Sequence, residues 1–146
     1  MKKIESAELV THAHTIMHTS GLKVTPQRTA VFEALVNQHR PTSVYDLRRA
    51  DKKIGRLNPI TIYRILEVFA RIGLAHRVSG NEFTFCGIPD GKKKGCHQFL
   101  ICDERESVTE VTLATCNEND IARKYGFRVF DHVNEIHGLC KECGAK

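Results

Sequence analysis

Six cysteines stand in the second half of this 146-residue chain, and the last two, Cys140 and Cys143, are separated by two residues. That spacing lets two thiolates reach one tetrahedral zinc ion, and Cys102 is the natural third ligand. No secretory signal is visible, so we expect a protein of the reducing cytoplasm, where clustered cysteines more often hold metal than form disulfides. The alternative is a secreted disulfide scaffold.

A second group of residues with metal-binding side chains lies further upstream in the chain. Its mixed nitrogen, sulfur and oxygen donors suit zinc. Because the group straddles the middle of the chain, a metal ion bound there could tie the two halves together. Taken singly, each member could instead be a packed cysteine or a solvated histidine. The members are His76, Cys86, Cys96, His97 and Glu110.

Charge is distributed unevenly between the halves of the chain. Residues 1–79 carry a net charge of +7, whereas residues 80–146 carry −2. A basic half joined to a mildly acidic half suggests that the first half binds a polyanion, although a solvated basic surface would look the same. We expect no membrane partner, because no stretch approaches the roughly 18 consecutive apolar residues of a membrane span.

The basic half has the order of elements of a winged helix-turn-helix. Apolar residues at helical spacing predict helices at about 4–18, from Pro26 onward, over 44–53 and over 59–72. Thr25, Ser43 and Asn58 have the residue types of helix caps. Two alternating segments, 75–79 and 82–85, then predict a β-hairpin.

A winged helix places its recognition helix in the major groove of DNA, where an arginine can hydrogen-bond guanine edges. We expect Arg64 to read bases, with Thr61 on the same exposed side of the helix and Tyr63 reaching a thymine methyl group or a phosphate. Basic residues elsewhere would contact the phosphate backbone. The candidates are Lys23, Arg28 and Arg56.

The acidic half predicts a small sheet with one helix. Strands are expected at 97–102, 107–113 and 127–136, the last with Phe127, Val129 and Val133 facing inward, and a helix at 117–126. Such a unit is marginal alone, and a second copy of the chain would cover its open face or edge. The fold class is therefore α+β, with domains at 1–84 and 96–146 and a hinge at 85–95.

Four segments together resemble the ferric-uptake-regulator (Fur) family of bacterial metal-dependent repressors. GLKVTPQR resembles the lead into its second helix, PITIYRILEVFARIGLAHRV its recognition helix and wing, and HQFLIC its metal-binding strand. HVNEIHGLCKEC is similar to the zinc-uptake-regulator (Zur) branch of the family. The match covers roughly residues 10–143.

The resemblance implies a homodimer with an N-terminal winged-helix DNA-binding domain and a C-terminal α/β dimerisation domain. Regulatory zinc would favour a closed shape that grips double-stranded palindromic operator DNA and represses transcription. By position, the sensing site would be His76, Cys86, His97 and Glu110, with Cys96 competing for one place. A structural zinc site would use Cys102, Cys140, Cys143 and one more ligand, and His132 matches a third site of some members.

The chain departs from the family pattern where the pattern has a second cysteine pair beginning at Cys102. Arg105 stands at the partner position, and a cation cannot ligate zinc. The fourth ligand would then come from Cys116, Asp103, Glu104 or Glu106, or from water, or the site would be absent.

The chain also departs from the pattern of the family's iron- and peroxide-sensing members in its metal-binding residues. The family's iron- and peroxide-sensing members have a histidine-rich run before the strand cysteine, and a histidine where this chain has Pro41. Fewer hard ligands and the presence of Cys86 favour zinc over ferrous iron. Iron, manganese or peroxide sensing is the alternative within the family.

A zinc-dependent enzyme and a structural zinc-ribbon protein are the alternatives to a regulator. A zinc-dependent enzyme lacks support, because no H-E-x-x-H, G-x-S-x-G or P-loop pattern occurs and nothing suggests a pocket for a small organic substrate. A structural zinc-ribbon protein that binds RNA or a ribosome would need no second, weaker metal site.

Overall fold

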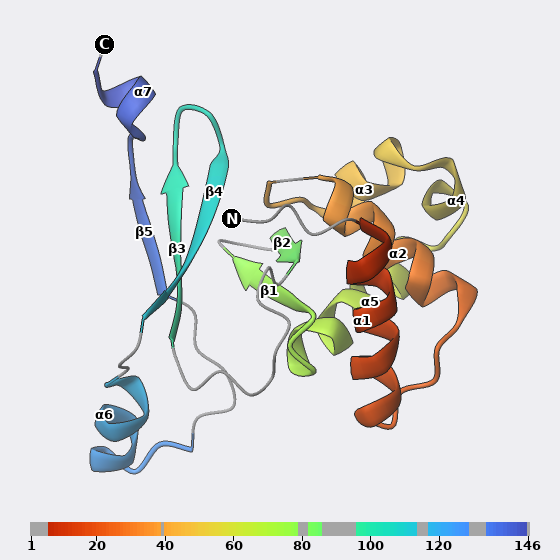
Figure 1. Cartoon of the computed structure of the whole chain (residues 1–146), viewed down its shortest axis with the longest axis horizontal. Helices are drawn as coiled ribbons and strands as arrows, with labels where there is room; N and C mark the ends of the chain where they lie inside the picture. The colour runs from red at the N-terminus through yellow and green to blue at the C-terminus, as the bar shows by residue number, and fades with distance from the viewer. Residues whose placement is uncertain are drawn as a thin grey trace. The chain divides into compact units, whose positions relative to one another are not determined.

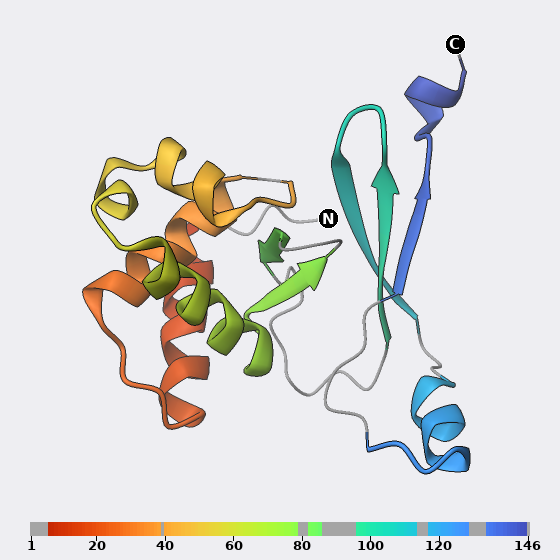
Figure 2. The same ribbon diagram turned by 180° about the vertical axis from the view of Figure 1, so that it is seen from behind.

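A computed structural model describes residues 6–38, 40–78, 82–85, 96–113, 117–128 and 134–145. The chain forms two compact units, Met1–Pro89 and Asp90–Lys146 (Figures 1 and 2). Helices dominate the first unit and strands the second, as the predicted α+β class requires. Residues 86–95 lie outside the described part, so the hinge at 85–95 stays a prediction. None of the described helices combines the length and apolar character that crossing a membrane demands.

The first unit consists of five helices followed by a hairpin among its described residues. The hairpin is antiparallel, with Ala75 opposite Phe85. Thr42 adds a short bridge to Phe83, with backbone hydrogen bonds of 2.9 and 3.0 Å. The elements are α1 Ser6–Thr19, α2 Pro26–Asn37, α3 Val44–Ala50, α4 Lys52–Gly55, α5 Pro59–Arg71, β1 Ala75–Val78 and β2 Glu82–Phe85.

Side-chain caps begin the helices that the sequence marked. The Thr25 hydroxyl accepts a hydrogen bond from the Arg28 amide at 3.3 Å, and Ser43 accepts one from Asp46 at 3.2 Å. Asn58 Oδ1 accepts one from the Ile60 amide at 2.9 Å, directly before Pro59 at the first turn of α5. Each cap satisfies an amide that the helix itself leaves unpaired.

One continuous core holds the first unit together. Leu9, Ala13 and Met17 recur at four-residue intervals, so α1 turns one stripe inward. The rings of Phe32 and Phe69 meet edge to face at 6.0 Å and join α2 to α5. On α5 the buried residues are Ile62, Ile65, Leu66 and Phe69.

The helix predicted over 44–53 is wrong, because the structure divides it at Asp51. Asp51 adopts an extended backbone, and its carboxylate accepts a hydrogen bond from the Lys53 amide at 2.8 Å. Aspartate competes well with the helical backbone in this way. It therefore ends α3 and caps the one-turn helix α4.

The second unit is a three-stranded sheet with two short helices. The strand order is β4-β3-β5, with β3 antiparallel to β4 and parallel to β5. Figure 1 shows the β3–β4 turn and α7 at one end of the sheet and α6 beyond the other end. The elements are β3 Cys96–Cys102, β4 Ser107–Leu113, α6 Glu118–Lys124, β5 Asn134–Gly138 and α7 Lys141–Gly144.

The predicted inward position of Phe127 is wrong, because its side chain is 74% exposed. Gly126 adopts a positive φ of 74°, and the Phe127 amide donates to the Ala122 carbonyl at 2.8 Å. Phe127 thus belongs to the C-terminal cap of α6 rather than to a strand. Val129 and Val133 lie outside the described residues, and β5 begins at Asn134.

The Asn58 cap should contribute measurably to stability, because it begins the most strongly amphipathic helix of the first unit. Replacing an Asn cap by Ala costs about 1 kcal/mol. We expect Asn58→Ala to lower the free energy of unfolding by about this amount in urea titrations, and Asn58→Asp, which keeps an acceptor oxygen, to retain most of it. Equal stability of Asn58→Ala and the parent would contradict the capping role.

Candidate metal centre and nucleic-acid interface

Three cysteine side chains meet at the end of the sheet in the second unit. The sulfur atoms of Cys102, Cys140 and Cys143 all lie within 4.8 Å of one another. Zinc–sulfur bonds of about 2.3 Å in a tetrahedron require sulfur separations of about 3.8 Å, so small side-chain adjustments would seat one zinc ion. Cys102 and Cys143 are buried, whereas Cys140 is partly exposed. The cluster fits a zinc ion in donor type, spacing and burial.

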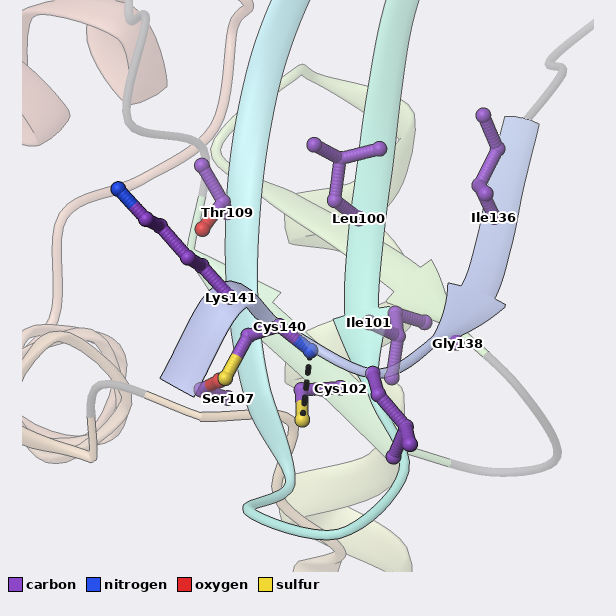
Figure 3. A pocket seen from close by; sticks show the side chains of 10 residues that line it. Leu100, Ile101, Cys102, Ser107, Thr109, Ile136, Gly138, Cys140 and Lys141 are labelled. Atoms are coloured by element: carbon purple, nitrogen blue, oxygen red, sulfur yellow. Dashed lines mark hydrogen bonds between the residues drawn. The ribbon is translucent and has the colours of Figure 1, made fainter. Parts of the chain in front are cut away.

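Strand pairing brings these cysteines together from segments 38 residues apart. Cys102 ends β3 directly beside Gly138 of the parallel strand β5, and the Asp103 amide donates to the Gly138 carbonyl at 2.9 Å. The Cys140 amide then donates to the Cys102 sulfur at 3.3 Å (Figure 3). One turn of α7, closed by a 2.8 Å hydrogen bond from the Gly144 amide to the Cys140 carbonyl, includes Cys143.

Backbone amides stabilise the ionised, thiolate form of Cys102. Hydrogen bonds from the amides of Cys140, Arg105 and Glu104 lower the pKa of Cys102 to about 7. Burial and the neighbouring sulfurs raise the pKa of Cys143 to about 12. Close thiolates repel one another, so the cluster cannot ionise fully without a cation. A divalent metal supplies the missing positive charge and releases the remaining protons.

The turn between β3 and β4 closes around the cluster. Glu106 takes a positive φ of 53°, uncommon for a residue with a side chain. Arg105 forms an ion pair with Glu142, and its pKa is raised by a hydrogen bond to the Cys140 side chain and by Glu142.

None of the carboxylates proposed as the fourth ligand joins the cluster among the described residues. Asp103 instead hydrogen-bonds the His137 ring at 2.9 Å, and Glu135 binds the other ring nitrogen at 3.0 Å. These two carboxylates raise the pKa of His137. Cys116 lies outside the described residues.

The second predicted metal site stays a prediction. His76 on β1 and Glu110 on β4 are both half-buried, and they belong to different units of the chain. Cys86 lies outside the described residues. Cys96 and His97 begin β3, but their side chains also lie outside the described part. The structure therefore describes two of the five proposed ligands.

Helix α5 presents a polar and basic face away from the core. Its buried residues occupy one side, so Arg64 projects into solvent and Thr61 is half-buried beside it. Ile60, in the first turn, is 61% exposed. An exposed arginine and an exposed aliphatic side chain can contact guanine edges and thymine methyl groups, respectively. Ile60 was missed at the sequence level because it resembles an ordinary core residue.

Tyr63 lies differently from Arg64. Its half-buried ring meets Phe83 edge to face at 5.8 Å, and the Arg77 guanidinium lies over the ring at 5.9 Å. Tyr63 therefore fixes the hairpin against α5. This packing explains how the helix and the wing are held in one orientation, which sequence patterns alone do not show.

The proposed phosphate contacts are spread around the same unit. Lys23 and Arg56 are exposed, in the loop before α2 and directly after α4, respectively. Arg28 is half-buried, and its guanidinium donates to the Lys23 carbonyl. Arg28 thus shapes the loop that carries Lys23. The exposed Arg49, which pairs with Asp46, adds positive charge that the sequence patterns had not singled out.

Comparisons with known proteins agree with this architecture. The profile of the ferric uptake regulator family matches residues 19–137. The zinc uptake regulation protein of Escherichia coli strain K12 is 31% identical over 98% of this chain and 85% of its own. The peroxide operon regulator of Bacillus subtilis strain 168 is 29% identical over 95% of each. A solved zinc uptake regulator complexed with zinc and DNA matches with a TM-score of 0.83 and 29% identity, over 98% of this chain and 97% of that one.

Removal of one cluster thiol should remove one bound zinc. We expect Cys143→Ser to lower zinc content by about one ion per chain in elemental analysis of purified protein, because two thiolates do not hold zinc in a structural site. The matched control is Ser107→Ala, opposite Cys102 in the sheet, which removes no thiol and should keep the parent content. Unchanged zinc in the Cys143 variant would remove this residue from the site.

Proposed function

Because this chain belongs to the ferric uptake regulator family, we propose that it is a zinc-responsive transcriptional repressor that binds palindromic operator DNA as a homodimer. It acts in the cytoplasm and is not an enzyme. Zinc serves it twice, in the Cys102–Cys140–Cys143 cluster and at a regulatory site. The regulatory ligands are His76, Cys86, His97 and Glu110, with Cys96 as the competitor for one place.

One observation carries the proposal. The chain matches a zinc uptake regulator complexed with zinc and DNA over almost its whole length, with a TM-score of 0.83. The likeness includes both units, so it supports a DNA-reading part and a metal-binding part in one chain. The exposed Arg64 and the sulfur cluster provide the chemistry for each part.

Zinc is favoured over the other metals of the family by donor chemistry. Thiolate and imidazole donors suit zinc, whereas iron- and manganese-dependent sensing relies more on nitrogen and oxygen donors. The peroxide operon regulator of Bacillus subtilis is nearly as similar in sequence, so peroxide sensing is the second candidate. The two candidates differ in which ion restores DNA binding to metal-free protein.

The mechanism combines two physical effects. Arg64 donates two hydrogen bonds to a guanine edge, while Lys23 and Arg56 neutralise phosphates and supply affinity without sequence preference. Two copies of the winged helix must lie about one helical turn, or a multiple of it, apart to read successive major grooves. Zinc that binds the competent arrangement more tightly than the others shifts the population toward it, with a coupling of about 1–3 kcal/mol.

A metal titration tests the proposal directly. Metal-free protein is mixed with operator duplex, and binding is followed by gel shift as zinc, ferrous iron or manganese is added at controlled free concentrations. We expect zinc to restore binding at the lowest free concentration. Restoration only by iron or manganese would favour the second candidate, and binding without any metal would reject a metal-responsive regulator.

Arg64 should determine sequence preference. A bidentate arginine–guanine contact is worth about 1–3 kcal/mol of discrimination. We therefore expect Arg64→Ala to reduce the ratio of operator to random-duplex affinity by roughly 5- to 150-fold. Lys23→Ala is the control, because loss of a phosphate contact weakens binding to both duplexes and reduces the salt slope by about 1. An unchanged affinity ratio in the Arg64 variant would show that α5 does not read bases.

Replacing Cys86 should impair the response to zinc without affecting the dimer. We expect Cys86→Ser to raise the zinc concentration needed for operator binding at least tenfold, because serine oxygen is a poorer zinc ligand than thiolate. The dimer, measured by analytical ultracentrifugation, and the zinc held by the Cys102 cluster should stay unchanged. A parental zinc response would take Cys86 out of the regulatory site.

A further inference from the structure

The turn that carries Cys102 is built like half of a four-cysteine site, with Arg105 at the place of the fourth ligand. Arg105 follows Cys102 by three residues, as Cys143 follows Cys140. The amides of Glu104 and Arg105 point at the Cys102 sulfur. The guanidinium meets Glu142, the residue between the two C-terminal cysteines. A cation therefore lies against the cluster where a thiolate would complete it.

Cys96 stands at the end of the sheet opposite to Cys102, where β3 begins. Cys96 and Leu113 face each other there, six residue steps along the strands from Cys102 and Ser107, or about 20 Å away. Cys116 itself lies outside the described residues.

The ring of His137, the histidine nearest in the chain to Cys140, is directed away from the cluster. His137 pairs with Ile101 in the register of β3 and β5, one residue before Cys102 and Gly138. Successive side chains alternate between the faces of a sheet, so His137 points away from the face of Cys102. Both of its ring nitrogens already bind carboxylates.

From this arrangement, and resting on the zinc site proposed above, we infer that the cluster binds zinc through three protein thiolates only. The fourth coordination position is filled from solvent, by water or by a small anion or thiolate, and Arg105 is the positioning residue beside it. The site thus has the open coordination position that closed structural zinc sites lack. It takes small exogenous ligands of the kind that bind zinc through sulfur or oxygen.

Charge explains why an arginine suits this place. One zinc ion with three thiolates carries a net charge of −1, which attracts the positively charged Arg105 guanidinium, as Glu142 does. Its N–H groups can donate to a ligand sulfur and to Glu142 together, which fixes the α7 turn against the β3–β4 turn. Groups that hydrogen-bond metal ligands in this way change metal affinity about 10- to 100-fold.

Solvent can reach the open position. The Arg105 and Glu142 side chains are 52% and 74% exposed. A shallow pocket of about 340 Å³ has Cys102, Cys140 and Ser107 in its wall (Figure 3). Solvent therefore reaches the Arg105 side of the cluster, and the pocket reaches two of its three cysteines.

Cobalt substitution tests the inference, because visible absorption of cobalt reports its ligands. The full chain is loaded with Co²⁺, and 2-mercaptoethanol is added to occupy an open position. We expect a shift of the cobalt bands in the parent, and no shift in Arg105→Cys, where a fourth protein thiolate fills the position. X-ray absorption of the zinc forms should count one more sulfur in Arg105→Cys than in the parent.

Three further variants distinguish failure of the zinc site, of the open position and of the guanidinium's role. Cys102→Ser should lose the cluster's sulfur-to-cobalt bands, and bands identical to the parent's would refute the zinc site itself. If the cluster's cobalt bands in the parent do not shift when 2-mercaptoethanol is added, the open position is refuted, while the proposed function still stands. Arg105→Gln should weaken zinc binding about tenfold, with Arg105→Lys between it and the parent. Equal affinity in Arg105→Gln would refute the role of the guanidinium.

Discussion

The meeting of three cysteine sulfurs within 4.8 Å of one another, where β3 ends and α7 begins, is the constraint on which the proposed zinc site depends. The described part of the C-terminal unit buries few apolar side chains completely, chiefly Phe99, Cys102 and Cys143. Small domains bury little of their surface on folding, so a cross-link adds usefully to their stability. A divalent cation bound by these sulfurs would cross-link the ends of β3 and β5, and metal binding would then contribute to folding.

The N-terminal unit, in contrast, is organised by its hydrophobic core and helix caps. It has a continuous core from α1 to the hairpin, and the caps at Thr25, Ser43 and Asn58 begin its helices without any metal. A rigid reader is useful because base contacts tolerate little misplacement. Tyr63 contributes to this rigidity by packing against Phe83 beneath Arg77. The chain therefore combines a helical unit with a continuous core and a smaller unit that a bound ion would cross-link.

Sequence patterns predicted the elements with strong local signals. The Asn58-Pro59 cap, the stripe of α5 and the alternating strands β3 and β4 are all where the residues indicated. Patterns failed where a particular hydrogen bond decides the path of the backbone. The break at Asp51 and the exposed Phe127 each depend on a local helix cap, and the bridge from Thr42 to Phe83 depends on a contact between distant segments. In the metal centre, spacing identified the three cysteines, but only the fold shows that Arg105 reaches Glu142.

Amide hydrogen exchange with and without zinc can decide whether the metal holds the second unit together, because exchange reports local opening along the chain. We expect zinc to slow exchange of the β3 and β5 amides strongly, together with exchange of the Cys140 amide that donates to the Cys102 sulfur. The core helices α2 and α5 should exchange equally slowly in both samples. Equal protection of β3 and β5 without the ion would contradict the claim that the metal holds this unit together.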